Sequence, residues 1–317
     1  MPDISIIIPS YNSERCLSAT LDSLLTQTVA DWECIVVDDG STDGSPQHAL
    51  QYAANDSRFR YLRQSNSGRA IACNTGYAAA SPDSRYLFFL DSDDCLVPKA
   101  LEILRNHLET NPSVGVVGCQ YQIIDGEGRD VGPGHRSRWV PAWPLARELR
   151  DSEFETPFVT FFCATGQGPF AMISRSVFDR TTGFEPALSP FSAHEDTDIF
   201  CQLALQAPVH YLPDRIYLKR DHGGNVTHSG DRITKSYDVF RKKWNSFKPA
   251  TAEQAKTLQQ AREFYYNVFL PLRDFKVGLK ALGESATERS FGKLRWSMHL
   301  FSSAVTGFLR RRGHATT

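Results

Sequence analysis

Short aliphatic runs alternate with amphipathic segments through the first part of the chain. Each run has the length and the β-branched content of a buried strand, and each is followed by apolar residues at helical spacing. The strand-like runs lie at 4–9, 34–37, 60–63 and 86–90, and the helix-like segments begin near 17, 45, 68 and 98. This alternation predicts an α/β fold in which crossover helices flank a mostly parallel sheet.

The pattern changes in the second half of the sequence. Residues 126–144 are rich in Gly, Pro, Arg and Trp and predict a long surface loop or a short irregular insertion. Around this loop, strands are predicted at 114–119, 169–174 and 210–220 and a helix at 196–206. Only helical spacing follows, so we expect a catalytic domain at 1–230 and a helical C-terminal extension at 231–317.

Charge and cysteine content narrow the class of protein. The chain carries 35 Lys and Arg against 36 Asp and Glu, so its charge does not mark it as a nucleic-acid binder. The seven cysteines are scattered without a C-x-x-C pair, which favours reduced thiols in a cytoplasmic protein. The sequence shows neither a signal peptide nor an apolar run of about 20 residues. We therefore expect a soluble protein with no nucleic-acid partner.

The apolar strand at 86–90 ends in three closely spaced carboxylates. Asp91 and Asp93 project to the same side of an extended chain, because side chains alternate with a period of two, and Asp94 follows directly. Clustered carboxylates at a buried strand end need a cation, and hard divalent ions prefer such oxygen ligands. The alternative is that Asp93 or Asp94 caps the helix that begins near Pro98.

Polar residues also follow the first two strands, at 9–12 and 38–43. The carboxyl ends of parallel strands meet at one edge, and open α/β sheets bind their ligands there. Tyr11 offers a ring that can stack on a nucleobase, and Asp39 offers an acceptor for a base N–H or a ribose hydroxyl. The sequence has no glycine-rich phosphate loop, so we expect a metal ion to hold the phosphates.

Six motifs occur in an order that is typical of one enzyme family. They lie at 5–12, 36–43, 66–76, 90–94, 183–184 and 194–198. With these motifs, the chain resembles the family 2 glycosyltransferases, whose GT-A fold is a Rossmann-like, mostly parallel sheet flanked by helices. The resemblance covers roughly the first 225 residues.

The resemblance implies an inverting glycosyltransferase. Such an enzyme moves a sugar from a nucleoside-diphosphate sugar, with UDP as the expected nucleotide, to a glycan or a lipid-linked acceptor. The family pattern places Pro9, Tyr11 and Asp39 against the nucleoside and Asp91 in the sugar-nucleotide site. It also implies that Asp93 coordinates a Mn²⁺ or Mg²⁺ ion that bridges the diphosphate. Polysaccharide biosynthesis for the cell envelope is the expectation at the level of the family.

The same pattern assigns a second acidic motif to the acceptor. Asp196 is expected to be the general base, and Glu195 to help orient the acceptor. One base without a nucleophilic carboxylate fits direct displacement with inversion. Acidic residues at the start of a helix are, however, also favoured by the helix dipole alone. His222 lies in a segment that resembles the family's Arg-x-His motif and is either a ligand of the metal or diphosphate or an ordinary loop histidine.

The chain departs from the family pattern at Cys73. Family members usually carry Arg at this position, directly before Asn74, and a neutral thiol cannot supply the same cationic contact. Arg69, one helical turn earlier, is the candidate that replaces it in the donor site. The alternative is a donor site that differs from that of the family.

Residues 291–312 combine an apolar helical face with basic residues. Such a helix suits contact with an anionic membrane surface, which would place the protein peripherally on the inner face of the plasma membrane. Docking of this helix on the catalytic domain or on a dimer partner is the alternative.

Two other classes of function compete with the glycosyltransferase. A non-catalytic sugar-nucleotide binding module would keep the nucleoside pocket but need no base, so Glu195 and Asp196 argue against it. A nucleotidyltransferase would begin with a glycine-rich basic loop, whereas the first strand here runs into Pro9 and Tyr11.

Overall fold

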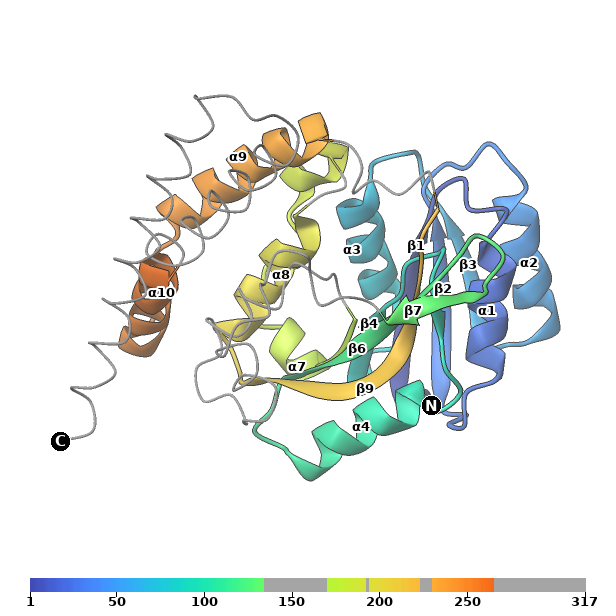
Figure 1. Cartoon of the computed structure of the whole chain (residues 1–317), viewed down its shortest axis with the longest axis horizontal. Coiled ribbons are helices and arrows are strands. Elements are labelled where there is room, and N and C mark those ends of the chain that lie inside the picture. Colours follow the sequence, from blue (N-terminus) through green and yellow to red (C-terminus); the bar gives the residue numbers. More distant parts are fainter. Residues whose placement is uncertain (134–169, 192–193, 223–229, 265–317) are drawn as a thin grey trace, which may run out of the picture. The chain divides into compact units, whose positions relative to one another are not determined.

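A computed structural model describes residues 1–133, 170–191, 194–222 and 230–264 (Figure 1). The chain divides into two compact units, Met1–Phe247 and Lys248–Thr317. Helix α9 (Gly230–Ser246) belongs to the first unit, and α10 (Ala252–Phe264) belongs to the second. Helix α9 packs on the 3₁₀ helix at Pro186–Phe191, which lies in the first unit.

A single mixed sheet forms the centre of the first unit. Its strands are β1 (Ile4–Ser10), β2 (Trp32–Asp38), β3 (Phe59–Arg63), β4 (Tyr86–Phe89), β5 (Cys95–Leu96), β6 (Val116–Ile124), β7 (Asp130–Pro133), β8 (Ala171–Ser174) and β9 (Val209–Arg220). They follow the order β3-β2-β1-β4-β8-β6-β9-β5, with β7 paired to β6. The strands β3, β2, β1 and β4 are parallel neighbours, whereas β8 runs antiparallel between β4 and β6.

Helices cover both faces of the parallel half of the sheet, as the alternating pattern predicted. The helices described before α9 are α1 (Leu17–Leu25), α2 (Ser45–Asn55), α3 (Arg69–Ala79), α4 (Ala100–Thr110), α7 (Arg175–Phe178) and α8 (Glu195–Ala204), with a 3₁₀ helix at Pro186–Phe191. Figure 1 shows α1 and α2 on one side of the strands and α3 on the other.

Alternate residues of the strands pack on these two helical layers. Ile4, Ile6 and Ile8 of β1 are fully buried in a cluster that includes the leucines of α1. Val37 of β2 faces the other way, in a cluster with Ala72 of α3. A side chain that points into the core on either face is expected of parallel strands buried on both sides.

The structure differs from the predicted elements in several places. The loop predicted at 126–144 contains β7, which pairs with the end of β6, and its residues after 133 lie outside the described part of the chain. The short strand β5 was not expected, because two residues show no periodicity. Helix α4 begins at Ala100 and not at Pro98.

The remaining expectations concern the cysteines and the membrane. Six cysteines lie in the described residues, and all six are free thiols. None of the helices searched in that part of the chain has the length and apolar character that a membrane span requires. The amphipathic segment at 291–312 lies outside the described residues.

Candidate active site

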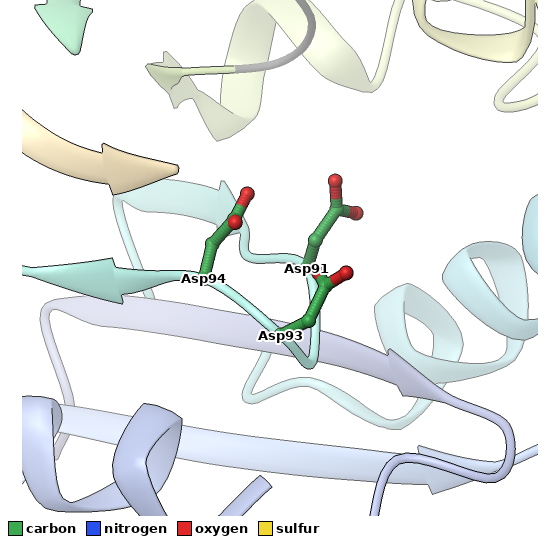
Figure 2. Close-up of side chains that lie close together, drawn as sticks. All are labelled: Asp91, Asp93 and Asp94. Carbon is green, nitrogen blue, oxygen red and sulfur yellow. The ribbon is translucent and has the colours of Figure 1, made fainter. Parts of the chain in front are cut away.

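Three carboxylates gather where β4 ends and β5 begins (Figure 2). One oxygen of each of Asp91, Asp93 and Asp94 can be chosen so that all three lie within 4.8 Å of one another. The two-residue strand β5 pairs with β9, so the chain turns sharply between two fixed strands and brings the carboxylates together. Local backbone geometry therefore produces the cluster.

Asp94 has a structural role within this cluster. It is 3% exposed, and its two oxygens accept hydrogen bonds from the Tyr217 hydroxyl and the Arg220 backbone N–H of β9, both at 2.7 Å. Neither Asp93 nor Asp94 caps α4, since Lys99 occupies the N-cap position and no side chain caps the helix. The capping alternative is therefore wrong.

Asp93 faces the histidine of the Arg-x-His segment. Its Oδ2 lies 3.0 Å from Nε2 of His222, and each side chain is about one third exposed. Burial raises the pKa of Asp93, the charge of Asp91 adds to the rise, and the hydrogen bond and charge of His222 oppose it. The structure thus places His222 beside the carboxylate cluster.

The donor set of the cluster suits a hard divalent cation. Oδ2 of Asp91 and Oδ1 of Asp93 accept no hydrogen bond from other residues in the described part of the chain. Carboxylate oxygens that remain free beside a second and third carboxylate are the ligands that Mg²⁺ and Mn²⁺ prefer. These residues therefore fit the metal expected from the sequence.

Arg69, the first residue of α3, connects the carboxylate cluster to α8. Its Nη2 lies 2.7 Å from Oδ1 of Asp91, and its Nη1 lies 2.7 Å from Oδ1 of Asp196. The side chain is 16% exposed. Cys73, one turn later on α3, is fully buried, and burial raises the pKa of its thiol. In α3 the guanidinium group is therefore supplied by Arg69, and position 73 carries a neutral thiol.

Asp196 and Glu195 begin α8 and differ in their surroundings. Asp196 is 29% exposed; burial raises its pKa, and the charge of Arg69 opposes the rise. Glu195 is 2% exposed, and its Oε1 has no hydrogen-bond partner among the described residues. Burial raises the pKa of Glu195 to about 8. At neutral pH, Glu195 is therefore protonated.

Helix α9 contacts the start of α8 at His194 and at Asp198. His194, in the left-handed region with φ 63°, places its Nδ1 3.0 Å from the Ser236 hydroxyl. One turn later, the buried carboxylate of Asp198 accepts hydrogen bonds from Lys243 Nζ and Trp244 Nε1, both at 2.8 Å. The chain on both sides of the acidic pair is thus fixed to α9. Sequence reasoning missed this support, because no pattern links residues this distant.

The residues expected at the nucleoside lie at the ends of β1 and β2. Pro9 is buried within β1, whereas Tyr11 directly follows the strand and is 50% exposed. An exposed ring at a strand end can receive a flat ligand.

Asp39 lies on the same edge but is largely engaged by the protein. It is 4% exposed, and it accepts hydrogen bonds from Gln64 Nε2 and from the backbone N–H groups of Ser67 and Gly68, at 2.7 to 2.8 Å. Gly68 has φ +89°, and a Cβ at this position would lie 2.5 Å from the carbonyl oxygen of Ser189. Asp39 therefore also fixes the loop that leads into α3.

The comparisons with known proteins agree with this architecture. The family model described as glycosyl transferase family 2 matches residues 5–182. The uncharacterized glycosyltransferase EpsJ of Bacillus subtilis is 29% identical over 269 residues, which are 84% of this chain and 70% of EpsJ.

A second relative is the Escherichia coli UDP-Glc:α-D-GlcNAc-diphosphoundecaprenol β-1,3-glucosyltransferase WfgD. It is 37% identical over 134 residues, 41% of this chain and 51% of WfgD. The chain thus spans about half the length of this relative.

Solved structures show the same fold at low sequence identity. Staphylococcus aureus TarS 1-349 in complex with UDP-GlcNAc aligns with a TM-score of 0.61 and 18% identity, over 96% of this chain and 82% of TarS. The mannosyltransferase PcManGT of Pyrobaculum calidifontis, in complex with GDP-Man and Mn²⁺, has a TM-score of 0.58 and 19% identity, over 97% of this chain and 87% of its own. The first unit therefore has the GT-A fold.

Proposed function

The chain belongs to glycosyl transferase family 2 and is a glycosyltransferase, and we propose that it moves a sugar from a UDP-linked donor to a glycan or lipid-linked acceptor with inversion. The ligands and substrates of similar proteins support this choice. TarS forms a complex with UDP-GlcNAc, and WfgD is named for a UDP-Glc donor and a diphosphoundecaprenol-linked acceptor. Synthesis of a cell-envelope polysaccharide is the biological setting that we propose.

The observation that carries the proposal is the double ion pair of Arg69. One guanidinium lies 2.7 Å from Asp91 and 2.7 Å from Asp196. A carboxylate of the proposed donor site and the proposed base are therefore separated by a single side chain. This arrangement would hold the donor and the acceptor next to each other, as a reaction between two bound substrates requires.

We assign the donor to the β1, β2 and β4 side of this edge. Tyr11, Pro9 and Asp39 contact the nucleoside, and Arg69 and Asp91 face the sugar diphosphate. A Mn²⁺ or Mg²⁺ ion held by Asp93, with His222 beside it, would neutralise the negative charge that develops on the departing diphosphate. The complex of PcManGT with GDP-Man and Mn²⁺ supports this choice of metal.

Asp196 acts as the general base. It accepts the proton of the acceptor hydroxyl as that oxygen attacks the anomeric carbon and the bond to the diphosphate breaks. Arg69 favours the ionised form of Asp196, which a base requires. Glu195 is protonated at neutral pH, so it is a poor nucleophile and can donate a hydrogen bond to the acceptor. Direct displacement with inversion follows.

A panel of UDP-, GDP- and dTDP-sugars tests the proposal. Binding and slow hydrolysis of each donor are measured with Mn²⁺, with Mg²⁺ and with EDTA, for the wild type, Asp93→Ala and Asp196→Asn. We expect EDTA and Asp93→Ala each to weaken donor binding by about tenfold or more. Asp196→Asn should keep binding but lower turnover by about 10²- to 10⁴-fold.

The control for this panel is Asp83→Asn, which changes an exposed aspartate before β4 and should alter neither quantity. Metal-dependent donor binding without turnover in the wild type would instead favour the non-catalytic sugar-nucleotide binding module. Donor binding that is insensitive to EDTA would refute the role of Asp93.

A further inference from the structure

Lys219 is a half-buried cation of β9 that the proposed mechanism does not use. It lies opposite Ile123 in the parallel pairing of β6 with β9. Its ammonium nitrogen lies 6.0 Å from the ring centroid of Tyr121 and 5.8 Å from that of Phe170. Contacts at this distance are at the outer limit of cation–π attraction and leave the ammonium hydrogens available.

The ammonium lacks an acceptor in the described part of the chain. A lysine has three N–H donors, and no hydrogen bond or ion pair of Lys219 occurs among those residues. Two other cations of the site, by contrast, have acceptors within the protein. Arg69 holds Asp91 and Asp196, and Arg220 donates to the backbone oxygen of Asp93. An ammonium whose donors are taken by no described residue is available to an anionic ligand.

Lys219 lies in β9 next to residues that contact the carboxylate cluster. Its neighbours on β9 reach the carboxylate cluster, since Leu218 pairs with Cys95 of β5 and Arg220 donates to Asp94 and to the backbone oxygen of Asp93. Lys219 is also within electrostatic reach of the base. Burial raises the pKa of Asp196, and the positive charges of Arg69 and Lys219 both oppose that rise.

We propose that Lys219 binds an anionic group, a phosphate or a carboxylate, on the acceptor glycan. This inference rests on the proposed function and defines the acceptor class for the same site. The rings of Tyr121 and Phe170 lie beside the ammonium of this half-buried side chain, so an anion gains more there than at a fully exposed lysine. Such an acceptor would be a sugar phosphate or diphosphate, or a uronic acid.

Pairs of acceptors that differ only in a negatively charged group distinguish the effect of that charge from the effect of the sugar. Once the donor panel has identified a donor, transfer is measured to octyl glucoside, octyl glucuronide and octyl glucosyl diphosphate, and to the neutral and diphosphate forms of N-acetylglucosamine. The wild type should prefer a charged member of a pair. Preference for the glucuronide or for the diphosphate distinguishes the two sources of negative charge.

Lys219→Met keeps most of the length of the side chain and removes its charge. We expect the preference, as the ratio of kcat/KM for the charged and neutral acceptors, to fall about 10- to 100-fold, while the donor KM stays within about twofold. Lys219→Arg should restore most of the preference. Lys99→Met, at an exposed lysine before α4, is the control.

Three outcomes would overturn the assignment. Equal losses for charged and neutral acceptors would mean that Lys219 acts only through Asp196, and a raised donor KM would place it at the donor. A wild type that prefers neutral acceptors would refute the anionic class without any variant. Donor hydrolysis without an acceptor keeps these results apart from failure of the proposed function, in which no donor binds or reacts.

Discussion

Glu195→Gln tests the electrostatics of the candidate site through folding stability. The carboxyl is 2% exposed, and burial raises its pKa from 4.5 to about 8. Between these two values the unfolded chain has lost the proton that the folded chain still holds. The unfolded state then binds fewer protons, so the free energy of unfolding falls as the pH rises through this window. The contribution of Glu195 to the free energy of unfolding is fully present only below the ordinary pKa of a glutamate.

The two pKa values set the size of the effect. Linkage gives a loss of about 3.5 kcal/mol between about pH 5 and pH 8 for this one carboxyl. Glutamine has nearly the same shape but does not titrate. The curve of unfolding free energy against pH should therefore be flatter in Glu195→Gln than in the wild type by about this amount.

Urea unfolding, followed by circular dichroism across that pH range, measures the difference. The exposed Glu14→Gln serves as the control, and its curve should run parallel to that of the wild type. Parallel curves for Glu195→Gln would refute the reasoning, because Glu195 would then ionise at the same pH in both states.

Variants of α3 and α8 test the other contacts. Arg69→Met removes a charge that opposes the raised pKa of Asp196, so the acidic limb of the kcat/KM profile should move to higher pH; an unmoved limb would contradict this. Asp198→Ala removes the carboxylate that accepts hydrogen bonds from Lys243 and Trp244 of α9 and should cost about 2 to 3 kcal/mol in urea unfolding; an unchanged midpoint would contradict that. Gly68→Ala forces a side chain onto φ +89° and should lower stability by about 1 to 3 kcal/mol in thermal unfolding. Gly126→Ala, where a Cβ meets no atom within 4 Å, is its control and should match the wild type.

Hydrophobic periodicity was sufficient for the regular part of the fold. The run at 4–9 became β1, Ile4–Ser10, and the run at 210–220 became β9, Val209–Arg220. Periodicity reports which side chains are buried, and it does not report backbone pairing. Strand β7, Asp130–Pro133, was therefore missed, because it contains Gly and Pro and joins the sheet through backbone hydrogen bonds to β6.

Residues of the candidate site could be predicted where charged side chains interrupt a run of apolar residues. Asp91 and Asp93 could be identified because carboxylates end an apolar strand. The partners of Asp198 could not, because Trp244 lies 46 positions further along the chain and only tertiary packing brings it close. Asp39 shows a second limit of sequence reasoning. The sequence does not reveal that other residues of the protein already donate hydrogen bonds to the carboxylate oxygens of Asp39.

The contacts between α9 and α8 have a consequence during translation, because the ribosome synthesises the chain from its N-terminus. The motifs of the nucleoside edge lie within the first 43 residues, whereas α9 ends at Ser246. A nascent chain can therefore complete its parallel strands while the proposed base still lacks the helix that fixes it. The chain should become catalytically active only after α9 has left the ribosomal exit tunnel. An incomplete chain can therefore bind a donor before it can transfer the sugar.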